Sequence, residues 1–275
     1  MKKTIFITGT SSGIGKATVK LFARKGWNVI ATMRKPENEK EINDLENVTL
    51  LPLDVNDPEQ INETIKSVTE KYDIDVVLNN AGYLLMGPLE GMSDEQIVQQ
   101  IQTNFFGVVR ITKAFIPYFK AKKQGLFLTT GSIAGLLAYP LGTMYDASKF
   151  AIEGFSESLA YELAPLNIGV KIIEPGIVVT ELVDKAPAVT HPNYQDLADS
   201  MAKTFSPDGA SKSDDIAEVV YQAATDSSSK LRYICGEDAI QFYAKRKELG
   251  EEAFIKDMHQ LIDVAKNNSS FTPKQ

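Results

Sequence analysis

The stretch Thr8-Gly9-Thr10-Ser11-Ser12-Gly13-Ile14-Gly15 decides the fold expected for this chain. It follows a short apolar run at residues 4–8 and precedes residues 14–25, whose apolar side chains recur at helical spacing. Glycines let the backbone pass close to a pyrophosphate, and a helix N-terminus offers free N–H groups and a partial positive charge. The order strand, glycine-rich turn, helix therefore predicts a dinucleotide-binding loop, although its spacing, G-x-x-x-G-x-G, differs from the common G-x-G-x-x-G. The alternative is a tight turn whose small residues serve packing alone.

The rest of the chain repeats this alternation of short apolar runs and helical segments. Pro58 suits the first turn of a helix, and Ser93 with Gln96 suits a helix N-cap. Alternation of this kind indicates an α/β fold with a single Rossmann-type, doubly wound parallel sheet of about seven strands and helices on both faces. Strands are predicted at 4–8, 29–33, 48–53, 74–78, 126–130, 170–173 and 232–235, and helices at 14–25, 58–71, 93–118, 145–164 and 213–225.

One dinucleotide-binding catalytic domain is expected over residues 1–275, because no change of composition marks a second domain. Between about residues 177 and 213 the alternation stops, and Pro187, Pro192 and Pro207 occur among polar residues with one short helical segment at 194–203. A long irregular segment in a compact domain is usually a lid or a binding loop. This insertion is therefore predicted to bind substrate, and a charged helical extension is expected from about residue 238.

The composition argues against several other classes of protein. The formal net charge is −7 and no basic stripe is visible, which is unlike a nucleic-acid-binding protein. With Cys235 as the single cysteine and only His191 and His259, no disulfide and no cysteine- or histidine-rich metal centre is predicted. No apolar stretch reaches the roughly 18 residues of a membrane span. We therefore expect a cytoplasmic protein with no nucleic-acid, membrane or metal partner.

Tyr145 and Lys149 form a second informative pattern, near the start of a predicted helix. Residues four apart lie on the same face of a helix. Two unit charges about 4 Å apart interact by roughly 4 kcal/mol at an effective dielectric near 20. The lysine would therefore lower the pKa of the tyrosine from about 10 towards neutrality, where acid–base catalysis is most efficient. The alternative is an ordinary amphipathic pair, with the tyrosine against the core and the lysine in water.

Arg34 follows the second predicted strand, in Ala31-Thr32-Met33-Arg34-Lys35. In NAD-binding folds an acidic residue near this position takes the ribose hydroxyls, whereas an arginine accommodates the 2′-phosphate of NADP. Met33 stands where the acid is expected, and a guanidinium matches a phosphate well. The pattern favours NADP, with NAD as the alternative cofactor if Arg34 and Lys35 are merely solvated loop charges.

Taken together, these features resemble the classical short-chain dehydrogenase/reductase family over nearly the whole chain to about residue 240. Each residue alone has an ordinary structural explanation as a turn, cap or packing residue, but their joint occurrence in the family's order and spacing favours the family. Gly131 stands where many relatives have a serine, and Ser12 stands where one NADP-type pattern has a basic residue. The motifs are Thr8–Gly15, Asp54-Val55, Asn79-Asn80-Ala81-Gly82, Asn104, Ser132, Tyr145 with Lys149, and Pro175-Gly176 with Thr180.

The resemblance implies roles for particular residues. Tyr145 would be the proton donor or acceptor, and Ser132 would hydrogen-bond the substrate oxygen. Lys149 would lower the pKa of Tyr145 and bind the nicotinamide ribose, while Asn104 would hold a water in a proton relay. Asp54 and Val55 would bracket the adenine, and the Ile177 backbone with Thr180 would fix the carboxamide. The implied cofactor-binding residues are Gly9, Ser11, Ser12, Gly13, Ile14, Gly15, Arg34, Asp54, Val55, Asn80, Ala81, Gly82, Tyr145, Lys149, Pro175, Gly176, Ile177 and Thr180.

The resulting hypothesis is an oxidoreductase that transfers hydride between NADP(H) and the carbonyl or alcohol carbon of a small molecule. Largely apolar residues at 84–86, 136–139 and 182–201 indicate a hydrophobic ketone, aldehyde or secondary alcohol. Two alternatives are a non-catalytic NADP-sensing or scaffolding protein and an epimerase or dehydratase with bound cofactor. Relatives commonly pair through the two long helices, so a homodimer or homotetramer is expected, with these helices at about 93–120 and 145–164.

Overall fold

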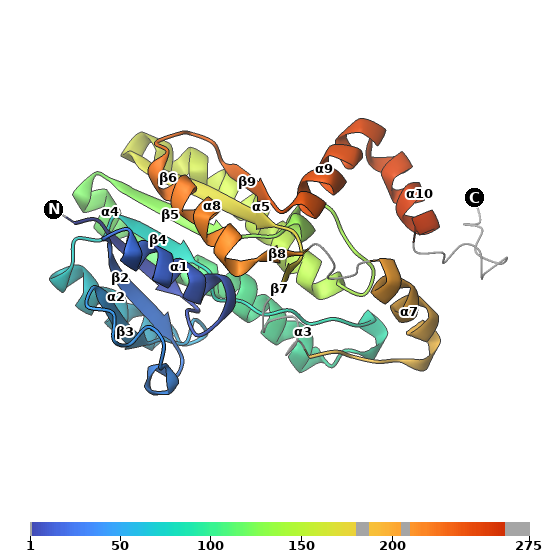
Figure 1. The fold of residues 1–275 in the computed structure, drawn as a ribbon, viewed down its shortest axis with the longest axis horizontal. Helices are drawn as coiled ribbons and strands as arrows, with labels where there is room; N and C mark the ends of the chain where they lie inside the picture. Colours follow the sequence, from blue (N-terminus) through green and yellow to red (C-terminus); the bar gives the residue numbers. More distant parts are fainter. Residues whose placement is uncertain (1, 180–186, 205–209, 262–275) are drawn as a thin grey trace.

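The computed structural model describes residues 2–179, 187–204 and 210–261 (Figure 1). In this part of the chain the main sheet has seven strands in the order β3-β2-β1-β4-β5-β6-β9, and every neighbouring pair is parallel. The predicted doubly wound parallel sheet is therefore confirmed. The strands are β1 (Thr4–Thr8), β2 (Asn28–Met33), β3 (Val48–Pro52), β4 (Val76–Asn79), β5 (Gly125–Thr130), β6 (Ile168–Pro175) and β9 (Arg232–Cys235).

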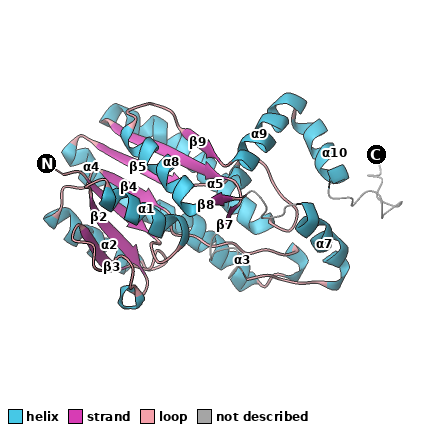
Figure 2. Cartoon of the chain, viewed as in Figure 1, coloured by secondary structure: helices cyan, strands magenta, loops and turns pink. Residues whose placement is uncertain are grey.

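Helices cover both faces of this sheet, as Figure 2 shows. On one face, α1 (Gly13–Arg24) packs beside α8 (Ser213–Thr225), and Phe22 and Val220 are fully buried in the core beneath them. On the other face lie α2 (Pro58–Lys71), α4 (Gly107–Lys122) and α5 (Thr143–Leu163), with Phe115 and Phe127 at the centre of a second core. Because both faces are covered, the strands read as continuous apolar runs instead of alternating ones.

The predicted single helix at 93–118 is interrupted. It consists of α3 (Asp94–Ile101), a π-helical turn η3 (Gln102–Phe106) and α4, which continues to Lys122 through Pro117. Ser93 caps the start of α3 in the predicted capping box with Gln96. The π-helical turn carries Asn104, and such turns are frequent at functional sites.

Short elements and three additional helices complete the described fold. The insertion after β6 contains β7 (Val178–Val179), η6 (Pro192–Tyr194), α7 (Gln195–Thr204) and β8 (Ser211–Lys212), and the C-terminal extension forms α9 (Glu237–Leu249) and α10 (Glu251–Leu261). In Figure 1 these helices lie beyond the end of the sheet opposite the N-terminus. The remaining 3-10 turns are η1 (Pro36–Asn38), η2 (Leu89–Gly91), η4 (Ile133–Gly135) and η5 (Ala164–Leu166). Among the described residues no helix is long and apolar enough to cross a membrane.

Candidate active site

A cavity of about 780 Å³ lies at the carboxyl ends of the parallel strands. Six loops that follow β1 to β6 contribute to it, which is where open α/β sheets bind their ligands. Gly15 and Asn104 lie outside this lining, and Thr180 lies outside the described residues. The predicted site residues that line the cavity are Gly9, Ser11, Ser12, Gly13, Ile14, Arg34, Asp54, Val55, Asn80, Ala81, Gly82, Ser132, Tyr145, Lys149, Pro175, Gly176 and Ile177.

The glycine-rich loop forms a tight cradle between β1 and α1. Gly9 has a φ of +71°, and a Cβ there would lie 2.6 Å from the Cα of Ala81. A Cβ at Gly15 would lie 2.3 Å from the carbonyl oxygen of Gly9. Ser12 is the N-cap of α1 but makes no side-chain capping bond, so the first N–H groups of the helix keep their donors for a ligand. The loop therefore fits the pyrophosphate of a dinucleotide.

Asn80 fixes this loop from the neighbouring strand. Its side-chain nitrogen donates to the carbonyl oxygens of Thr8 and Gly9 at 3.1 and 3.0 Å, and its side-chain oxygen accepts from the hydroxyl of Thr130 at 3.2 Å. The hydroxyl oxygen of Thr8 accepts from the backbone N–H groups of Asn80 and Ala81, each at 3.0 Å. These bonds tie together the loops after β1, β4 and β5, so Asn80 positions the cradle as well as lining the cavity.

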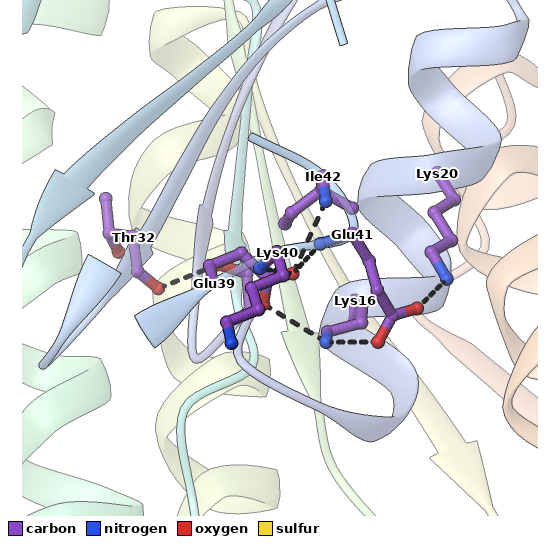
Figure 3. A network of polar contacts seen from close by, with 8 residues as sticks. Lys16, Lys20, Thr32, Glu39, Lys40, Glu41 and Ile42 are labelled. Carbon is purple, nitrogen blue, oxygen red and sulfur yellow. Dashed lines mark hydrogen bonds and ion pairs between the residues drawn. The ribbon is translucent and has the colours of Figure 1, made fainter. Parts of the chain in front are cut away.

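Arg34 lines the cavity from the loop after β2, is exposed and takes part in no ion pair within the described residues. The loop after it is held on α1 by Glu39, whose Oε2 lies 3.1 Å from Nζ of Lys16 (Figure 3). The other oxygen of Glu39 accepts from the N–H groups of Lys40, Glu41 and Ile42 at 3.0, 2.7 and 3.3 Å. Burial opposes the charge on Glu39, but these hydrogen bonds and Lys16 lower its pKa. A fixed loop therefore presents the free guanidinium.

Three predicted catalytic side chains converge on the cavity wall. Ser132 follows β5, and its hydroxyl hydrogen-bonds Tyr145 in the first turn of α5. Lys149, one turn later, donates to the carbonyl oxygen of Thr130 at 2.9 Å and lies 5.6 Å from the centre of the Tyr145 ring. Tyr145 and Lys149 thus lie on the same face of α5, as their spacing predicts.

The electrostatics differ from the prediction. Burial raises the pKa of Tyr145 to about 12, with Asp146 and Glu174 adding to the effect and the Ser132 hydrogen bond opposing it. Burial likewise lowers the pKa of Lys149 to about 8, against the pull of Glu174 and Glu153. The prediction that Lys149 brings the pKa of Tyr145 towards neutrality is therefore wrong for the chain by itself. Loss of hydration destabilises the tyrosinate and the ammonium group by more than their mutual attraction stabilises them.

Asn104 is buried in the π-helical turn η3, and its side chain is hydrogen-bonded within the protein. Its amide nitrogen donates to the carbonyl oxygen of Tyr83 and the hydroxyl of Ser148 at 2.9 and 3.2 Å, and its oxygen accepts from the Tyr83 N–H at 3.0 Å. Gln100, one turn earlier, bonds the backbones of Tyr83 and Leu85. Both side chains anchor the cavity wall after β4. The water relay through Asn104 stays a prediction, because both amide hydrogens are engaged within the protein.

The Ile177 backbone is also engaged within the chain. Its N–H donates to Oδ2 of Asp238 at 2.7 Å, and its carbonyl oxygen accepts from the N–H of Ser211 at 2.9 Å. A contact between the Ile177 N–H and a carboxamide would require exchange of the Asp238 bond. That assignment therefore stays a prediction.

Comparison with known proteins agrees with this geometry. A family model described as short chain dehydrogenase matches residues 3–189. The chain belongs to this family. It is 38% identical over 227 residues to an uncharacterised oxidoreductase of Schizosaccharomyces pombe, covering 81% of this chain and 96% of the relative. It is 36% identical over 204 residues to a 3-ketodihydrosphingosine reductase of Bacteroides thetaiotaomicron, covering 73% and 74%. Among solved structures, ElxO with NADP bound shares 28% identity and a TM-score of 0.73, covering 85% of this chain and 98% of ElxO.

Sequence reasoning missed two acids at the site of this short-chain dehydrogenase. Asp146 lines the cavity beside Tyr145 and accepts from the N–H of Tyr139 at 2.7 Å, and burial raises its pKa to about 7. Glu174 is fully buried on β6 and accepts from the N–H of Ser132 at 2.9 Å. Two features of the sequence could have indicated them: Asp146 lies between Tyr145 and Lys149, and Glu174 is the only acid in the run 168–175.

Proposed function

We propose that this short-chain dehydrogenase transfers hydride between NADP(H) and the carbonyl or alcohol carbon of a hydrophobic ketone, aldehyde or secondary alcohol. The observation that carries the proposal is the convergence of Ser132, Tyr145 and Lys149 on a cavity that also contains the glycine-rich cradle. A bound nicotinamide supplies the hydride. The chain then has to hold the carbonyl, donate a proton to its oxygen and exclude competing water.

The three side chains suit these tasks in the direction of reduction. Tyr145 is protonated over the whole physiological range, because burial raises its pKa to about 12, so a proton is available for the substrate oxygen. The Ser132 hydroxyl accepts from the Ala134 N–H at 3.1 Å and hydrogen-bonds Tyr145, so its position is fixed before substrate arrives. Fixed donors at a developing oxyanion lower the barrier without reorganisation during the reaction. Lys149 places its positive charge beside the Tyr145 ring, where it would stabilise a tyrosinate left after proton donation.

Arg34 supports a preference for NADP over NAD. Arg34 is a cation that no described residue pairs with, on a fixed loop that lines the cavity, and Met33 occupies the position of the usual ribose-binding acid. The solved structure of ElxO contains NADP. A charged hydrogen bond to a phosphate contributes about 1.5–3 kcal/mol, which is sufficient for a marked preference.

The substrate side of the cavity is mainly apolar. Leu84 and Met86 come from the loop after β4, and Pro187 and Met201 come from the insertion. This supports the predicted role of the insertion in substrate binding, within the part of it that the structure describes. One relative is named for 3-ketodihydrosphingosine, a ketone on a hydrocarbon chain. We therefore propose a ketone or secondary alcohol with an extended apolar group.

The test is a spectrophotometric screen of NADPH and NADH oxidation with a panel of aliphatic, aromatic and cyclic ketones, together with the reverse reaction on their alcohols. We expect turnover with long or cyclic apolar ketones and faster reaction with NADPH. The rival proposal, a non-catalytic NADP sensor, predicts cofactor binding with no turnover. A non-catalytic sensor would not require Ser132, Tyr145 and Lys149 at the same cavity, so this is the weaker proposal.

The oligomeric state belongs to the same proposal. Val98 of α3, Phe106 of η3 and Phe150 of α5 are 55%, 40% and 43% exposed, which is unusual for large apolar side chains in one region of the surface. We propose that α3, α4 and α5 of two chains pair in a homodimer, or in a homotetramer that contains it. Sedimentation equilibrium of the protein and a Val98→Lys/Phe150→Lys variant would test this, with a monomeric wild-type protein as the contrary result. A cytoplasmic location remains a prediction.

A further inference from the structure

A pair of buried carboxyl groups lies directly behind the catalytic side chains. Glu174 of β6 and Glu153 of α5 are 0% and 7% exposed, and their carboxyl groups are close enough to interact directly. Their other oxygens have different partners. Oε2 of Glu174 accepts from the Ser132 N–H at 2.9 Å, and Oε2 of Glu153 accepts from Nε of Arg232 at 2.6 Å.

The remaining oxygen of each carboxyl group identifies where the proton must be. Oε1 of Glu174 and Oε1 of Glu153 are both buried, and neither has a hydrogen-bond partner among the described residues. Two carboxylates cannot hydrogen-bond each other, because both only accept. A single proton between the two groups satisfies both atoms, and burial together with Glu153 raises the pKa of Glu174 well above its ordinary value.

The backbone beside Ser132 packs closely against the Glu174 carboxyl group. A Cβ on Gly131 would lie 2.7 and 2.9 Å from the two carboxyl oxygens of Glu174 and 2.8 Å from Cγ2 of Ile172. Any larger residue at position 131 would therefore displace the glutamate. The glycine leaves the Ser132 N–H in direct contact with Glu174, while the Ser132 hydroxyl on the other side reaches Tyr145.

We propose that Glu174 is a positioning residue, which shares one proton with Glu153 and thereby holds Ser132 in place for its contact with Tyr145. The shared proton has a second consequence. A negative charge on Glu174 would oppose ionisation of Tyr145 and would hold the proton on Lys149 more tightly. The proton between the two acids keeps this charge away from the site.

The groups that face Glu174 come from three elements besides its own. Glu153, Lys149 and Tyr145 belong to α5, and Cys235 belongs to β9. Ser132, from the loop after β5, contributes only its N–H. Arg232 of β9 pairs with Oε2 of Glu153 at 2.6 Å and so acts on Glu174 through Glu153. Release of the shared proton would therefore be detected at Tyr145 and Lys149 together.

The inference rests on the proposed reductase function, and the first experiment does not use turnover. In the infrared difference spectrum of wild type minus Glu174→Gln at pH 7, the C=O stretching band of a protonated carboxyl group should appear. The band of Asp146, whose pKa burial raises to about 7, is common to both proteins and cancels. Glu174→Leu should also speed hydrogen exchange of the Ser132 amide, whereas Glu174→Gln should not, because glutamine can still accept from that N–H. Identical spectra, or unchanged exchange in Glu174→Leu, would overturn the proposal.

The second experiment uses the pH profile of kcat/KM. Glu153→Gln removes the carboxylate that keeps the proton on Glu174. The resulting charge on Glu174 opposes ionisation of Tyr145, so the profile should move to higher pH by about one unit. The double variant Glu153→Gln/Glu174→Gln lacks this charge and should restore the wild-type profile. Glu157→Gln is the matched control, since Glu157 also bonds Arg232 from α5 but its side chain is 44% exposed. Glu174→Leu should lower kcat by about tenfold or more with little change in NADPH affinity. If Glu153→Gln is active and its pH profile is unchanged, the inference about Glu174 is refuted. If the wild-type protein shows no turnover, the reductase proposal is refuted, and the infrared spectra and the hydrogen exchange alone test the inference about Glu174.

Discussion

The Lys149 ammonium nitrogen lies 5.6 Å from the centre of the Tyr145 ring and donates to the carbonyl oxygen of Thr130. The lysine is thus held by the backbone of β5 as well as by its place on α5. Its charge is close to the tyrosine, yet burial and two nearby acids raise the pKa of Tyr145 to about 12. Separate roles for the phenol and the ammonium group follow from this arrangement.

Tyr145→Phe should therefore lower kcat for ketone reduction by about 10²–10⁴-fold, because the proton donor is lost. The affinity for NADPH should change little, since the phenylalanine ring fills the same space. Lys149→Met should damage both quantities, because the lysine is assigned to the tyrosine and to the ribose. Single-turnover kinetics and fluorescence titration with NADPH separate the two effects. Equal loss of affinity and rate in Tyr145→Phe would refute this division of roles.

Asp146 makes stability depend on pH. Burial raises its pKa from the ordinary value of 3.8 to about 7, so between these values the folded chain binds a proton that the unfolded chain does not. This contribution is fully present below about pH 4 and is lost as the pH rises through 7. Asp146→Asn should accordingly be more stable than wild type above pH 7, by at most about 4 kcal/mol, and equally stable near pH 4.

Urea unfolding at pH 4, 6 and 8 measures this difference. Asparagine can still accept from the Tyr139 N–H, so the turn that contains Gly142 is preserved. The exposed Asp44→Asn serves as the control for removal of a charge. A stability difference that is the same at all three pH values would contradict the assignment.

Much of this structure follows from local patterns in the sequence. The strand–turn–helix order around residues 4–25 and the helix at 58–71 were predictable, because buried parallel strands are continuous apolar runs and because prolines and caps mark helix starts. The π-helical turn at Asn104 was not, since it depends on hydrogen bonds to Tyr83, which is distant in sequence. The Glu153–Glu174 pair was hidden for the same reason. Two acids in separate elements give no sign that the fold will bury them together.

Arg34→Ala should raise KM for NADPH by about 10–100-fold, as expected for loss of a charged hydrogen bond to a phosphate, and should leave KM for NADH within about twofold. Lys35→Ala is the matched control, because Lys35 is an exposed cation next in sequence that does not line the cavity. Steady-state kinetics with both cofactors and one ketone are sufficient. Equal increases for NADPH and NADH in Arg34→Ala would show that Arg34 does not recognise the 2′-phosphate.

The C-terminal extension is joined to the active site through one apolar cluster. Phe254 and Met258 of α10 are 2% and 6% exposed, and they are buried with Ile133 and Leu137 from the segment between Ser132 and Tyr145. Tyr139 of the same segment packs edge-on against Phe242 of α9, with ring centroids 6.3 Å apart, and lines the cavity. Docking of α10 should therefore hold one wall of the substrate side in place.

Phe254→Ala should destabilise the docked helix by about 3–5 kcal/mol, the usual cost of removing a buried phenylalanine. Because the wall at 133–139 would loosen while the glycine-rich cradle is untouched, KM for the ketone should rise and the affinity for NADPH should stay the same. Ile255→Ala, on the same helix but 47% exposed in the wild-type protein, should change neither quantity. If Phe254→Ala lowers the melting temperature yet leaves KM for the ketone unchanged, α10 stabilises the fold without shaping the substrate site.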